Sequence, residues 1–338
     1  MGIAVLVGDS LGTGDVFMLK KAIAVVTSGG DSPGMNAAAR AVVRTAIYEG
    51  VEVYGVHNGY SGMVHDDIEK LTTRSVSDLI QRGGTFLGTA RSKSFMTPEG
   101  RKTAFDNLCK RGIEGLVIIG GDGSLTGGSL LSKETGMPIV GLPGTIDNDV
   151  WGMDYTIGCD TACNTIVDAI NKLRDTASAH RRIILVEVMG RHSGWLAMMS
   201  GIAGGAEYIL VPEVAYDLEE ISCELKEMYE AGKRYSIIVV AEGAGSAVEI
   251  GKIIGEKTEI DTRVSVLGHI QRGGSPTVED RIKASMLGEK AALAIISGIN
   301  DVIFSFNEGQ VVSVNLFEAV NNKKTLDPEL VRLARVLA

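Results

Sequence analysis

Two short segments rich in glycine and aspartate constrain this chain most, because each follows an apolar run that predicts a buried strand. Gly120–Ser124 follows Leu116–Ile119, and Pro143–Asp149 follows Ile139–Leu142. Open α/β sheets bind ligands at the carboxyl ends of their parallel strands. Glycine lets backbone N–H groups approach a phosphate, and aspartate can hold the accompanying magnesium ion. The two segments therefore predict phosphoryl transfer at a sheet edge.

Apolar runs alternate with helical segments along the chain, which predicts parallel sheets with helices on both faces. The 338 residues leave room for two domains, and a boundary is expected just after residues 149–158, where loop-forming residues are dense. Strands are predicted at residues 22–26, 51–56, 116–119, 139–142, 183–188, 208–211, 237–241, 264–267 and 302–306. Helices are predicted at residues 37–49, 98–111, 161–177, 218–231 and 278–297.

The composition narrows the class of protein. The net charge is −9, so a general nucleic-acid binder, which needs a basic surface, is disfavoured. An acidic protein that handles anions must gather its cations locally, so clustered arginines are the feature to look for. No apolar stretch reaches membrane-spanning length, and the four cysteines form no metal-binding pattern. We therefore expect a cytoplasmic protein with reduced thiols and no membrane partner.

A third glycine-rich segment, Thr27–Asn36, follows the first predicted strand and opens a helix. Such a turn can bind an anion, but an ordinary strand-to-helix turn looks the same. In Gly120–Ser124, Asp122 has the alternative role of capping a helix. The chain has no G-x-G-x-x-G and no complete Walker motif, so a dinucleotide fold or a P-loop is unsupported.

Asp147 and Asp149 stand two residues apart, behind the turn Pro143–Gly144. Phosphorylation of an alcohol needs one carboxylate to accept the hydroxyl proton and another to manage the metal. Two solvated loop aspartates are the alternative. Arg191 follows another predicted strand, and we expect it at the same sheet edge as Asp147, where a guanidinium can bind a phosphate with two N–H groups.

Further cations gather around the strand predicted at residues 264–267. Arg263 precedes this strand, His269 and Arg272 follow it, and Arg182 lies just before the strand at residues 183–188. A sugar phosphate needs such a cluster of charged donors.

Six segments together resemble the 6-phosphofructokinase family, over a region from about Met18 almost to the C-terminus. Their order and spacing are far more specific than any one of them. The resemblance implies an α/β fold with two similar Rossmann-like three-layer α/β/α domains, largely parallel sheets, an active site in the cleft between them, and a homotetramer. The segments are Thr27–Asn36, Arg82–Thr85, Gly120–Ser124, Pro143–Asp149, Met189–Arg191 and Gly268–Pro276.

The resemblance also implies domain limits. Residues 18–158 and about 271–321 would form the ATP-binding domain, and residues 159–270 and about 322–338 the fructose 6-phosphate-binding domain. Residues 1–17 would be an N-terminal extension that turnover does not need, either an extra strand at Ile3–Val7 or a non-native start.

The family moves the γ-phosphoryl group of ATP to the 1-hydroxyl of fructose 6-phosphate, the committed step of glycolysis, giving fructose 1,6-bisphosphate and ADP. The resemblance implies that Asp147 is the general base and that Asp122 binds Mg²⁺ with support from Asp149. Arg91 and Arg191 would stabilise charge on the transferred group, near Thr145. The residues implied to contact ATP are Gly30, Arg91, Gly121, Asp122, Gly123 and Ser124.

The sugar phosphate is implied to bind mainly to the second domain. Arg182 and Arg263 would reach its 6-phosphate from a neighbouring subunit, so that oligomerisation completes the site. The implied contacts are Thr145, Asp147, Asp149, Arg182, Met189, Gly190, Arg191, Glu242, Arg263, His269 and Arg272.

Gly123 and Gly144 favour ATP as the phosphoryl donor. Relatives that use pyrophosphate carry aspartate and lysine at these positions, where bulk and charge would obstruct the α-phosphate of a nucleotide. Pyrophosphate stays open as an alternative, because Glu242–Ala244 and Arg191–Ser193 are similar to a branch that includes pyrophosphate enzymes.

Two other functions are weaker alternatives. A kinase of NAD or a lipid would not need the cluster in Gly268–Pro276. A non-catalytic regulatory subunit would have lost its carboxylates, whereas Asp122, Asp147 and Asp149 are all present.

Allosteric control is expected of the family, but its effectors are left open. Thr73 and Ala231 stand where the family's bacterial effector site often has basic residues. The residues that match that site are Arg40, Arg44, Arg174, Glu207, Lys233 and Arg234.

Overall fold

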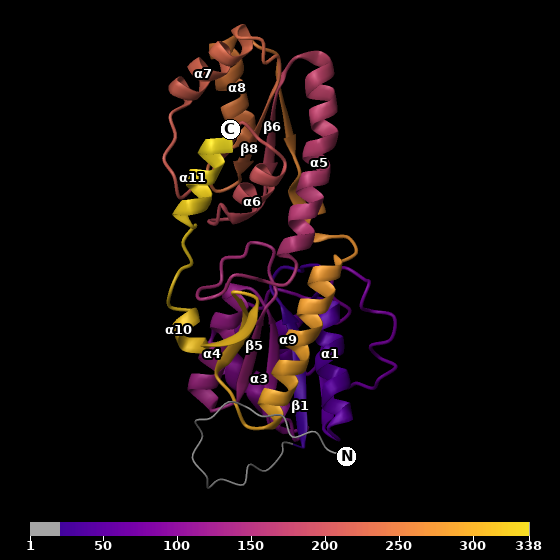
Figure 1. The fold of residues 1–338 in the computed structure, drawn as a ribbon. Coiled ribbons are helices and arrows are strands. Elements are labelled where there is room, and N and C mark those ends of the chain that lie inside the picture. The colour runs from indigo at the N-terminus through magenta and orange to yellow at the C-terminus, as the bar shows by residue number, and fades with distance from the viewer. Residues whose placement is uncertain (1–20, 338) are drawn as a thin grey trace.

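Two β-sheets, one in each lobe of the molecule, organise the computed structural model, which describes residues 21–337 (Figure 1). The larger sheet has seven strands in the order β11-β10-β5-β4-β1-β2-β3, and the smaller has four in the order β7-β8-β6-β9. The expected extension 1–17 and the strand at Ile3–Val7 lie outside the described residues.

The larger sheet is parallel except at its two edges, where β3 and β11 run antiparallel to their neighbours. Neither edge strand was predicted, because β3 is only three residues long and β11 is mostly half-exposed or exposed. Its strands are β1 (Ala22–Ser28), β2 (Glu52–Val56), β3 (Ile68–Lys70), β4 (Leu116–Gly120), β5 (Ile139–Pro143), β10 (Val302–Asn307) and β11 (Gln310–Asn315).

The smaller sheet is parallel throughout. Its strands are β6 (Ile183–Val188), β7 (Tyr208–Leu210), β8 (Ser236–Ala241) and β9 (Thr262–Val266). Strand β9 forms one edge and is buried far less than β6 and β8.

Alternate residues of each central strand face opposite helical layers, which explains why these strands read as continuous apolar runs. In the larger sheet, Val25 packs towards α1 (Met35–Tyr48) and α9 (Val278–Ile296). Ala24 packs on the other face, towards α2 (Gly59–His65), α3 (Pro98–Cys109) and α4 (Asp122–Thr135).

The smaller sheet repeats this three-layer arrangement. One face packs against α5 (Cys159–His180), α6 (Trp195–Ala203) and α11 (Pro328–Leu337). The other face packs against α7 (Leu218–Glu230) and α8 (Ala247–Thr258). The predicted α/β class with two layered domains and largely parallel sheets is confirmed.

The predicted helices are present, with ends that shift by a few residues. A helix start near Asp122 was an expected alternative, but the extent of α4 was not predicted, because its sequence has too many glycines and serines for high helix propensity. Packing explains its formation instead: a Cβ atom at Gly128 would come within 2.4 Å of Ile118 Cδ1, so glycine lets α4 lie directly on β4. Helices α8, α11 and the short α10 (Leu316–Ala319) were also missed.

The chain crosses between the lobes three times. It crosses after β5 to enter α5, after the 3₁₀ helix Gly268–Arg272 to enter α9, and after α10 to enter α11 (Figure 1). Elements of both chain halves therefore contribute to each lobe, while the domain limits given above stay a prediction.

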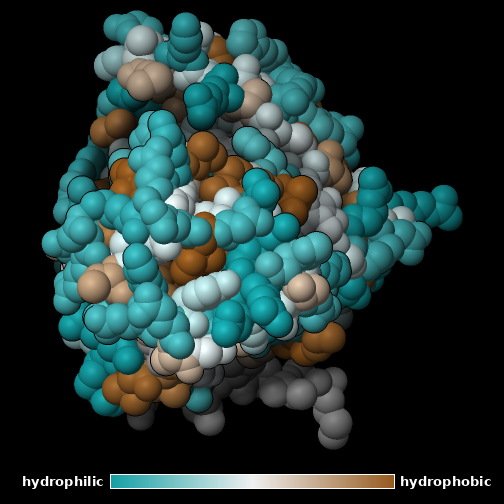
Figure 2. Space-filling model, turned by 90° about the horizontal axis from the view of Figure 1, so that it is seen from above, coloured by the Kyte–Doolittle hydropathy of each residue, from teal (hydrophilic) through white to brown (hydrophobic). Residues whose placement is uncertain are grey.

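Hydrophilic residues cover most of the end of the molecule that the smaller sheet occupies, with hydrophobic residues in patches between them (Figure 2). Across residues 21–337, no helix combines the length and apolarity that a membrane crossing requires.

The contact between α1 and α9 gives a test of the fold. A Cβ atom at Gly288 would lie 2.4 Å from the carbonyl oxygen of Ala38 and 2.8 Å from Ala41 Cβ. We expect Gly288→Ala to lower the free energy of unfolding by about 1–3 kcal/mol, because the backbone of α1 must move. Glu289→Ala, on the exposed side of α9, is the control. Urea unfolding measures both variants, and equal stabilities would contradict the packing described here.

Candidate active site

A cleft of about 590 Å³ lies at the carboxyl ends of β1, β4 and β5 and receives residues that follow the smaller sheet's strands. Ten of the predicted site residues line it together: Gly30, Arg91, Gly121, Asp122, Gly123, Ser124, Thr145, Asp147, Asp149 and Arg191, with Arg272 as an eleventh. The structure thus gathers all of the predicted nucleotide and catalytic residues in one place.

Arg191 and Asp147 do not share a sheet edge, so that prediction is wrong. Asp147 follows β5 in the larger sheet, and Arg191 follows β6 in the smaller. The two side chains approach across the cleft, with Arg191 Nε 3.9 Å from Asp147 Oδ2. Strand–helix alternation predicts the ends of strands but not which sheet each strand joins, which explains the error.

Glycines form one wall of the cleft. Helix α4 begins at Asp122, and its N-cap residue Gly121 provides no side-chain hydrogen bond. A Cβ atom at Gly123 would meet no other atom within 4 Å, so this position opens into the cleft. Backbone N–H groups at a helix start favour an anion, and the cleft lets one approach the first turn of α4.

Arg272 crosses from the smaller sheet's side to the turn after β1. Its Nη1 donates a hydrogen bond to the carbonyl oxygen of Asp31, at 3.1 Å. A Cβ atom at Gly30 would lie 2.3 Å from the same Nη1. Glycine at position 30 therefore makes room for the guanidinium, and the two lobes touch directly at the cleft.

Asp147 and Asp149 flank Asn148, whose backbone has the left-handed φ of 48°. Asp147 is 3% exposed, and its backbone N–H donates to Thr145 Oγ1 at 3.2 Å. Among the described residues, the Oδ1 atoms of both aspartates are buried without a hydrogen-bond partner. Buried carboxylate oxygens without a donor are costly unless a proton or a cation joins them.

Both carboxyl groups hold their protons more tightly than usual. Burial raises the pKa of Asp147, while the charges of Arg272 and Arg191 oppose that shift. Burial, and then repulsion from Asp147, raises the pKa of Asp149 to about 6. A carboxylate whose pKa is raised in this way is a stronger base than a solvated one.

Glu242 orients the loop that carries Arg191. Its Oε1 accepts hydrogen bonds from the backbone N–H groups of Gly190, at 3.2 Å, and Arg191, at 2.8 Å. Arg191 has the left-handed φ of 53°, which is costly for a residue with a long side chain. The carboxylate of Glu242 stabilises that conformation by satisfying both donors.

Met189 and Gln271 link the loops that follow β6 and β9. The Met189 N–H donates to Oε1 of Gln271, which is fully buried, at 3.1 Å. Sequence reasoning singled out the neighbours of Gln271 but gave it no role. Its position between His269 and Arg272, as an uncharged residue among cations, could have indicated a structural role for Gln271.

An apolar end of the cleft was also missed. The rings of Tyr60 and Phe95 are stacked with centroids 3.9 Å apart, and Met96 and Leu130 line the same end. The Tyr60 hydroxyl donates to the carbonyl oxygen of Ser124, which joins this end to the glycine wall. The chain has few aromatic residues and these two are far apart in sequence, so no local pattern predicted the pair.

Several predicted sugar-phosphate residues lie away from the cleft. Arg182 Nε and Arg263 Nη2 each lie 3.0 Å from a carboxylate oxygen of Asp261, beside edge strand β9. His269 is exposed. Their predicted roles across a subunit interface are untested by a single chain.

The donor set of the cleft fits a magnesium ion that arrives with phosphates. Residues 21–337 contain no group of three histidine, cysteine, aspartate or glutamate side chains close enough to enclose a metal. Mg²⁺ usually takes only one or two carboxylates and fills its other positions with water and substrate phosphates. Asp122 and the unpartnered oxygens of Asp147 and Asp149 line the same cleft and supply that chemistry.

Comparison with known proteins gives consistent matches. The Phosphofructokinase family model matches residues 22–295. A curated ATP-dependent 6-phosphofructokinase from Bacillus licheniformis is 57% identical over 318 residues, which cover 94% of this chain and 99% of the relative.

Solved structures agree in fold. The structure of phosphofructokinase from Saccharomyces cerevisiae matches with a TM-score of 0.84 and 40% identity over 89% of this chain. The present chain spans 45% of that yeast chain. A pyrophosphate-dependent phosphofructokinase from Nitrosospira multiformis matches with a TM-score of 0.85, over 94% of this chain and 91% of that one, but at 20% identity this shows the fold alone.

The buried carboxyl of Asp149 predicts a pH-dependent stability. Because its folded-state pKa of about 6 exceeds the ordinary value of 3.8, ionisation costs stability as the pH rises between those values. Asp149→Asn removes that cost, so we expect the metal-free variant to be about 1–3 kcal/mol more stable than the parent at pH 7.5. The difference should shrink towards pH 4. Thermal unfolding at both pH values measures it, and a gain that is the same at both would contradict the buried charge as its cause.

Proposed function

The chain belongs to the phosphofructokinase family, and we propose that it transfers the γ-phosphoryl group of ATP to the 1-hydroxyl of fructose 6-phosphate. The products are fructose 1,6-bisphosphate and ADP. The observation that carries the proposal is the pairing of buried Asp147 with Arg191 across the cleft, beside the glycine wall. In this proposal a general base, a cation and an anion-binding helix start act together in one cleft.

Asp147 acts as the general base in this proposal. Its carboxylate accepts the proton of the 1-hydroxyl as that oxygen attacks the γ-phosphorus, and its raised pKa strengthens it as a base. Arg191 and Arg91 line the cleft, where their fixed charges stabilise the phosphoryl group during transfer. The hydroxyl of Thr145 accepts a hydrogen bond from the Asp147 N–H and so holds the loop beside them.

The apolar end of the cleft supports a nucleotide as the donor. Exposed Met96 and Leu130, with the buried stacked pair Tyr60 and Phe95 nearby, provide an apolar surface for a nucleobase, which pyrophosphate lacks. Gly123 leaves space where a side chain would project into the cleft. At Gly144 a Cβ atom would lie 2.7 Å from buried Met35 Cε, so a lysine cannot enter without rearrangement. The relative from Bacillus licheniformis is named as ATP-dependent.

The sugar phosphate is held by residues from the second lobe in this proposal. Met189, Gly190, Glu242 and His269 contact the sugar and its 6-phosphate together with Arg272. Arg182 and Arg263 reach the same phosphate from another subunit of a homotetramer. Both arginines pair with Asp261 beside edge strand β9, and this closeness supports a shared role in binding the phosphate.

Magnesium is the expected cofactor. When bound, it neutralises phosphate charge and orients the phosphoryl groups. Asp122 is the proposed ligand from the chain, and Asp149 adds negative charge beside it.

Regulation and location stay predictions. Of the residues that match the bacterial effector site, Lys233 Nζ lies 3.1 Å from Glu207 Oε1, and Arg40 and Arg44 share helix α1. The cytoplasm is where we expect this glycolytic activity.

The decisive assay supplies fructose 6-phosphate and Mg²⁺ with ATP or pyrophosphate as parallel donors and measures fructose 1,6-bisphosphate. Turnover with ATP supports the proposal. Turnover mainly with pyrophosphate would keep the family but contradict the donor, and no turnover with either would favour a regulatory subunit.

Asp147→Asn tests the general base. We expect kcat to fall by about 10²–10⁴-fold, because the amide cannot accept the proton, while binding of the sugar phosphate is largely kept. Steady-state kinetics in fructose 6-phosphate measures both parameters. Wild-type kcat in this variant would remove Asp147 from the mechanism.

A further inference from the structure

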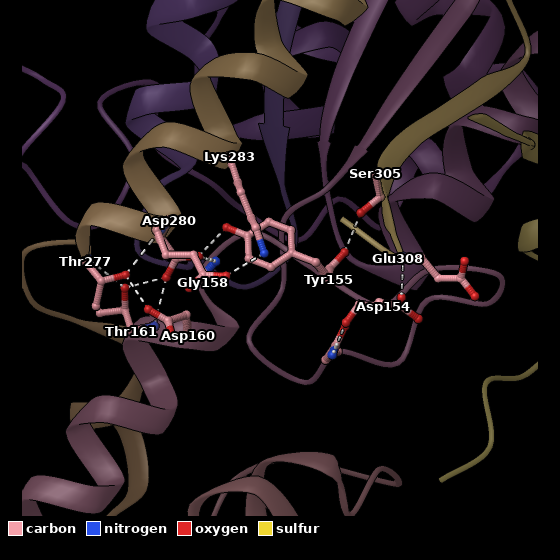
Figure 3. A network of polar contacts seen from close by, with 12 residues as sticks. Asp154, Tyr155, Gly158, Asp160, Thr161, Thr277, Asp280, Lys283, Ser305 and Glu308 are labelled. Carbon is pink, nitrogen blue, oxygen red and sulfur yellow. Dashed lines mark hydrogen bonds and ion pairs between the residues drawn. The ribbon is translucent and has the colours of Figure 1, made fainter. Parts of the chain in front are cut away.

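A buried polar cluster joins the two lobes where α5 and α9 begin (Figure 3). We call it the junction cluster; Asp280 is at its centre. Asp280 is fully buried and accepts hydrogen bonds from the Gly158 N–H at 2.9 Å and the Thr161 N–H at 2.8 Å. The hydroxyls of Tyr155 and Thr161 also donate to it. The cluster consists of Tyr155, Gly158, Asp160, Thr161, Thr277 and Asp280.

Asp280 of α9 caps helix α5, whereas α9 is capped by its own Thr277, whose side chain accepts a hydrogen bond from the Asp280 N–H at 3.2 Å. Helix α5 starts after Gly158, which offers no side-chain cap, and Asp280 of α9 accepts its first N–H groups instead. In return, the Thr277 N–H donates to Thr161 Oγ1 at 3.0 Å, and the Thr277 hydroxyl donates to Asp160 Oδ2 at 2.6 Å. Helix α5 packs on the smaller sheet and α9 on the larger, so this capping fixes one lobe to the other.

The same two crossings carry catalytic residues into the cleft. One crossing begins with Asp147 and Asp149 and then enters α5, while the other passes Arg272 and then enters α9. The first is held at a second point, because Asn148 Nδ2 donates to the carbonyl oxygen of Asp154 at 2.9 Å. The Asp154 N–H donates to the Phe306 carbonyl oxygen on β10 at 3.0 Å.

We propose that Asp280 is a positioning residue for phosphoryl transfer, because it fixes the two crossings to each other and so sets Asp147 opposite Arg191 and Arg272. The inference rests on the proposed function for its kinetic consequence. A buried carboxylate with several donors is a rigid connection. Displacement of a reacting group by about 1 Å can cost about 10²-fold in rate, so a looser junction lowers turnover without removing any group that touches substrate.

The position of the nucleotide site makes it possible to distinguish a positioning role of Asp280 from a general role in stabilising the fold. The residues proposed to hold ATP, including Gly30, Met96, Gly123 and Leu130, all belong to the lobe of the larger sheet. A loosened junction leaves them in place. Catalysis needs both lobes and is therefore the step that Asp280 affects.

The kinetic test is Asp280→Asn. The amide keeps the volume, but its NH₂ group faces the N–H donors of Gly158 or Thr161. We expect kcat to fall by about 10–100-fold, with the dissociation constant for Mg-ATP unchanged in equilibrium dialysis. Glu279→Gln is the matched control, because Glu279 is the exposed neighbour that pairs with Lys283. Wild-type kcat in Asp280→Asn, or an equal loss of ATP binding, would overturn the proposal.

A second measurement does not depend on turnover. Cys109 on α3 and Cys223 on α7 are the exposed cysteines, one in each lobe. Cys159 is buried, and burial raises the pKa of the Cys163 thiol, so both react slowly with a label. Spin labels on Cys109 and Cys223, in protein diluted with unlabelled chains, report the distance between the lobes.

We expect Asp280→Asn to broaden or shift this distance distribution, and Glu279→Gln to leave it as in the parent chain. An unchanged distribution in Asp280→Asn would overturn the proposal. If Asp280→Asn does not fold, Tyr155→Phe and Thr161→Val each remove one donor and carry the same test. If the parent chain lacks the proposed activity but Asp280→Asn still changes the distance distribution, the proposed function is rejected. The role of Asp280 in holding the two lobes together is then retained.

Discussion

The approach of Asp147 and Arg191 across the cleft is the interaction on which the site depends, because the two residues come from different sheets. Their atoms lie 3.9 Å apart, although they follow strands of different sheets. Contacts between the lobes hold that distance: Ile146, next to Asp147, is buried in the core of the smaller sheet, and Arg272 donates to the carbonyl of Asp31. The junction of the lobes is therefore part of the active site.

Charge burial follows from this arrangement. Asp147 and Asp149 are removed from water and repel each other, so burial dominates the pKa of both carboxyls. The arginines compensate only in part, because Arg191 is largely exposed on its side of the cleft. A cation that binds among these carboxylates would relieve their repulsion. The charge distribution of the site therefore suits a metal ion that arrives with phosphates.

The sequence was sufficient for the elements whose signals are local. Buried parallel strands are continuous apolar runs, and β6 matched its predicted limits of Ile183–Val188. Glycine and aspartate at strand ends marked residues that line the cleft. Signals that depend on tertiary contacts were not visible: α4 forms because Gly128 lies against Ile118, and edge strand β11 forms by pairing with β10.

The residues of the site likewise divide into those with a local sequence signal and those that depend on tertiary contacts. Asp122, Asp147 and Gly123 could be predicted because each follows an apolar run in the sequence. The placement of Arg191 was wrong in one respect, since alternating strands do not reveal to which sheet β6 belongs. The stacked pair Tyr60 and Phe95 could not be predicted, because the two rings meet only after α2 and the segment before α3 have packed together.

Backbone strain lies on both sides of the cleft, and it has a common physical reason. Asn148 and Arg191 both adopt left-handed backbone conformations, with φ of 48° and 53°. Each is held by hydrogen bonds: the Asn148 side chain donates to the Asp154 carbonyl within the same loop, and the Arg191 N–H donates to Glu242 from the loop after β8. A residue in this conformation turns the chain sharply, so its neighbours can present side chains that an extended or helical segment would direct elsewhere. Asn148 lets two carboxylates leave β5 towards one cleft, and the turn at Arg191 brings its guanidinium back across the gap to meet them.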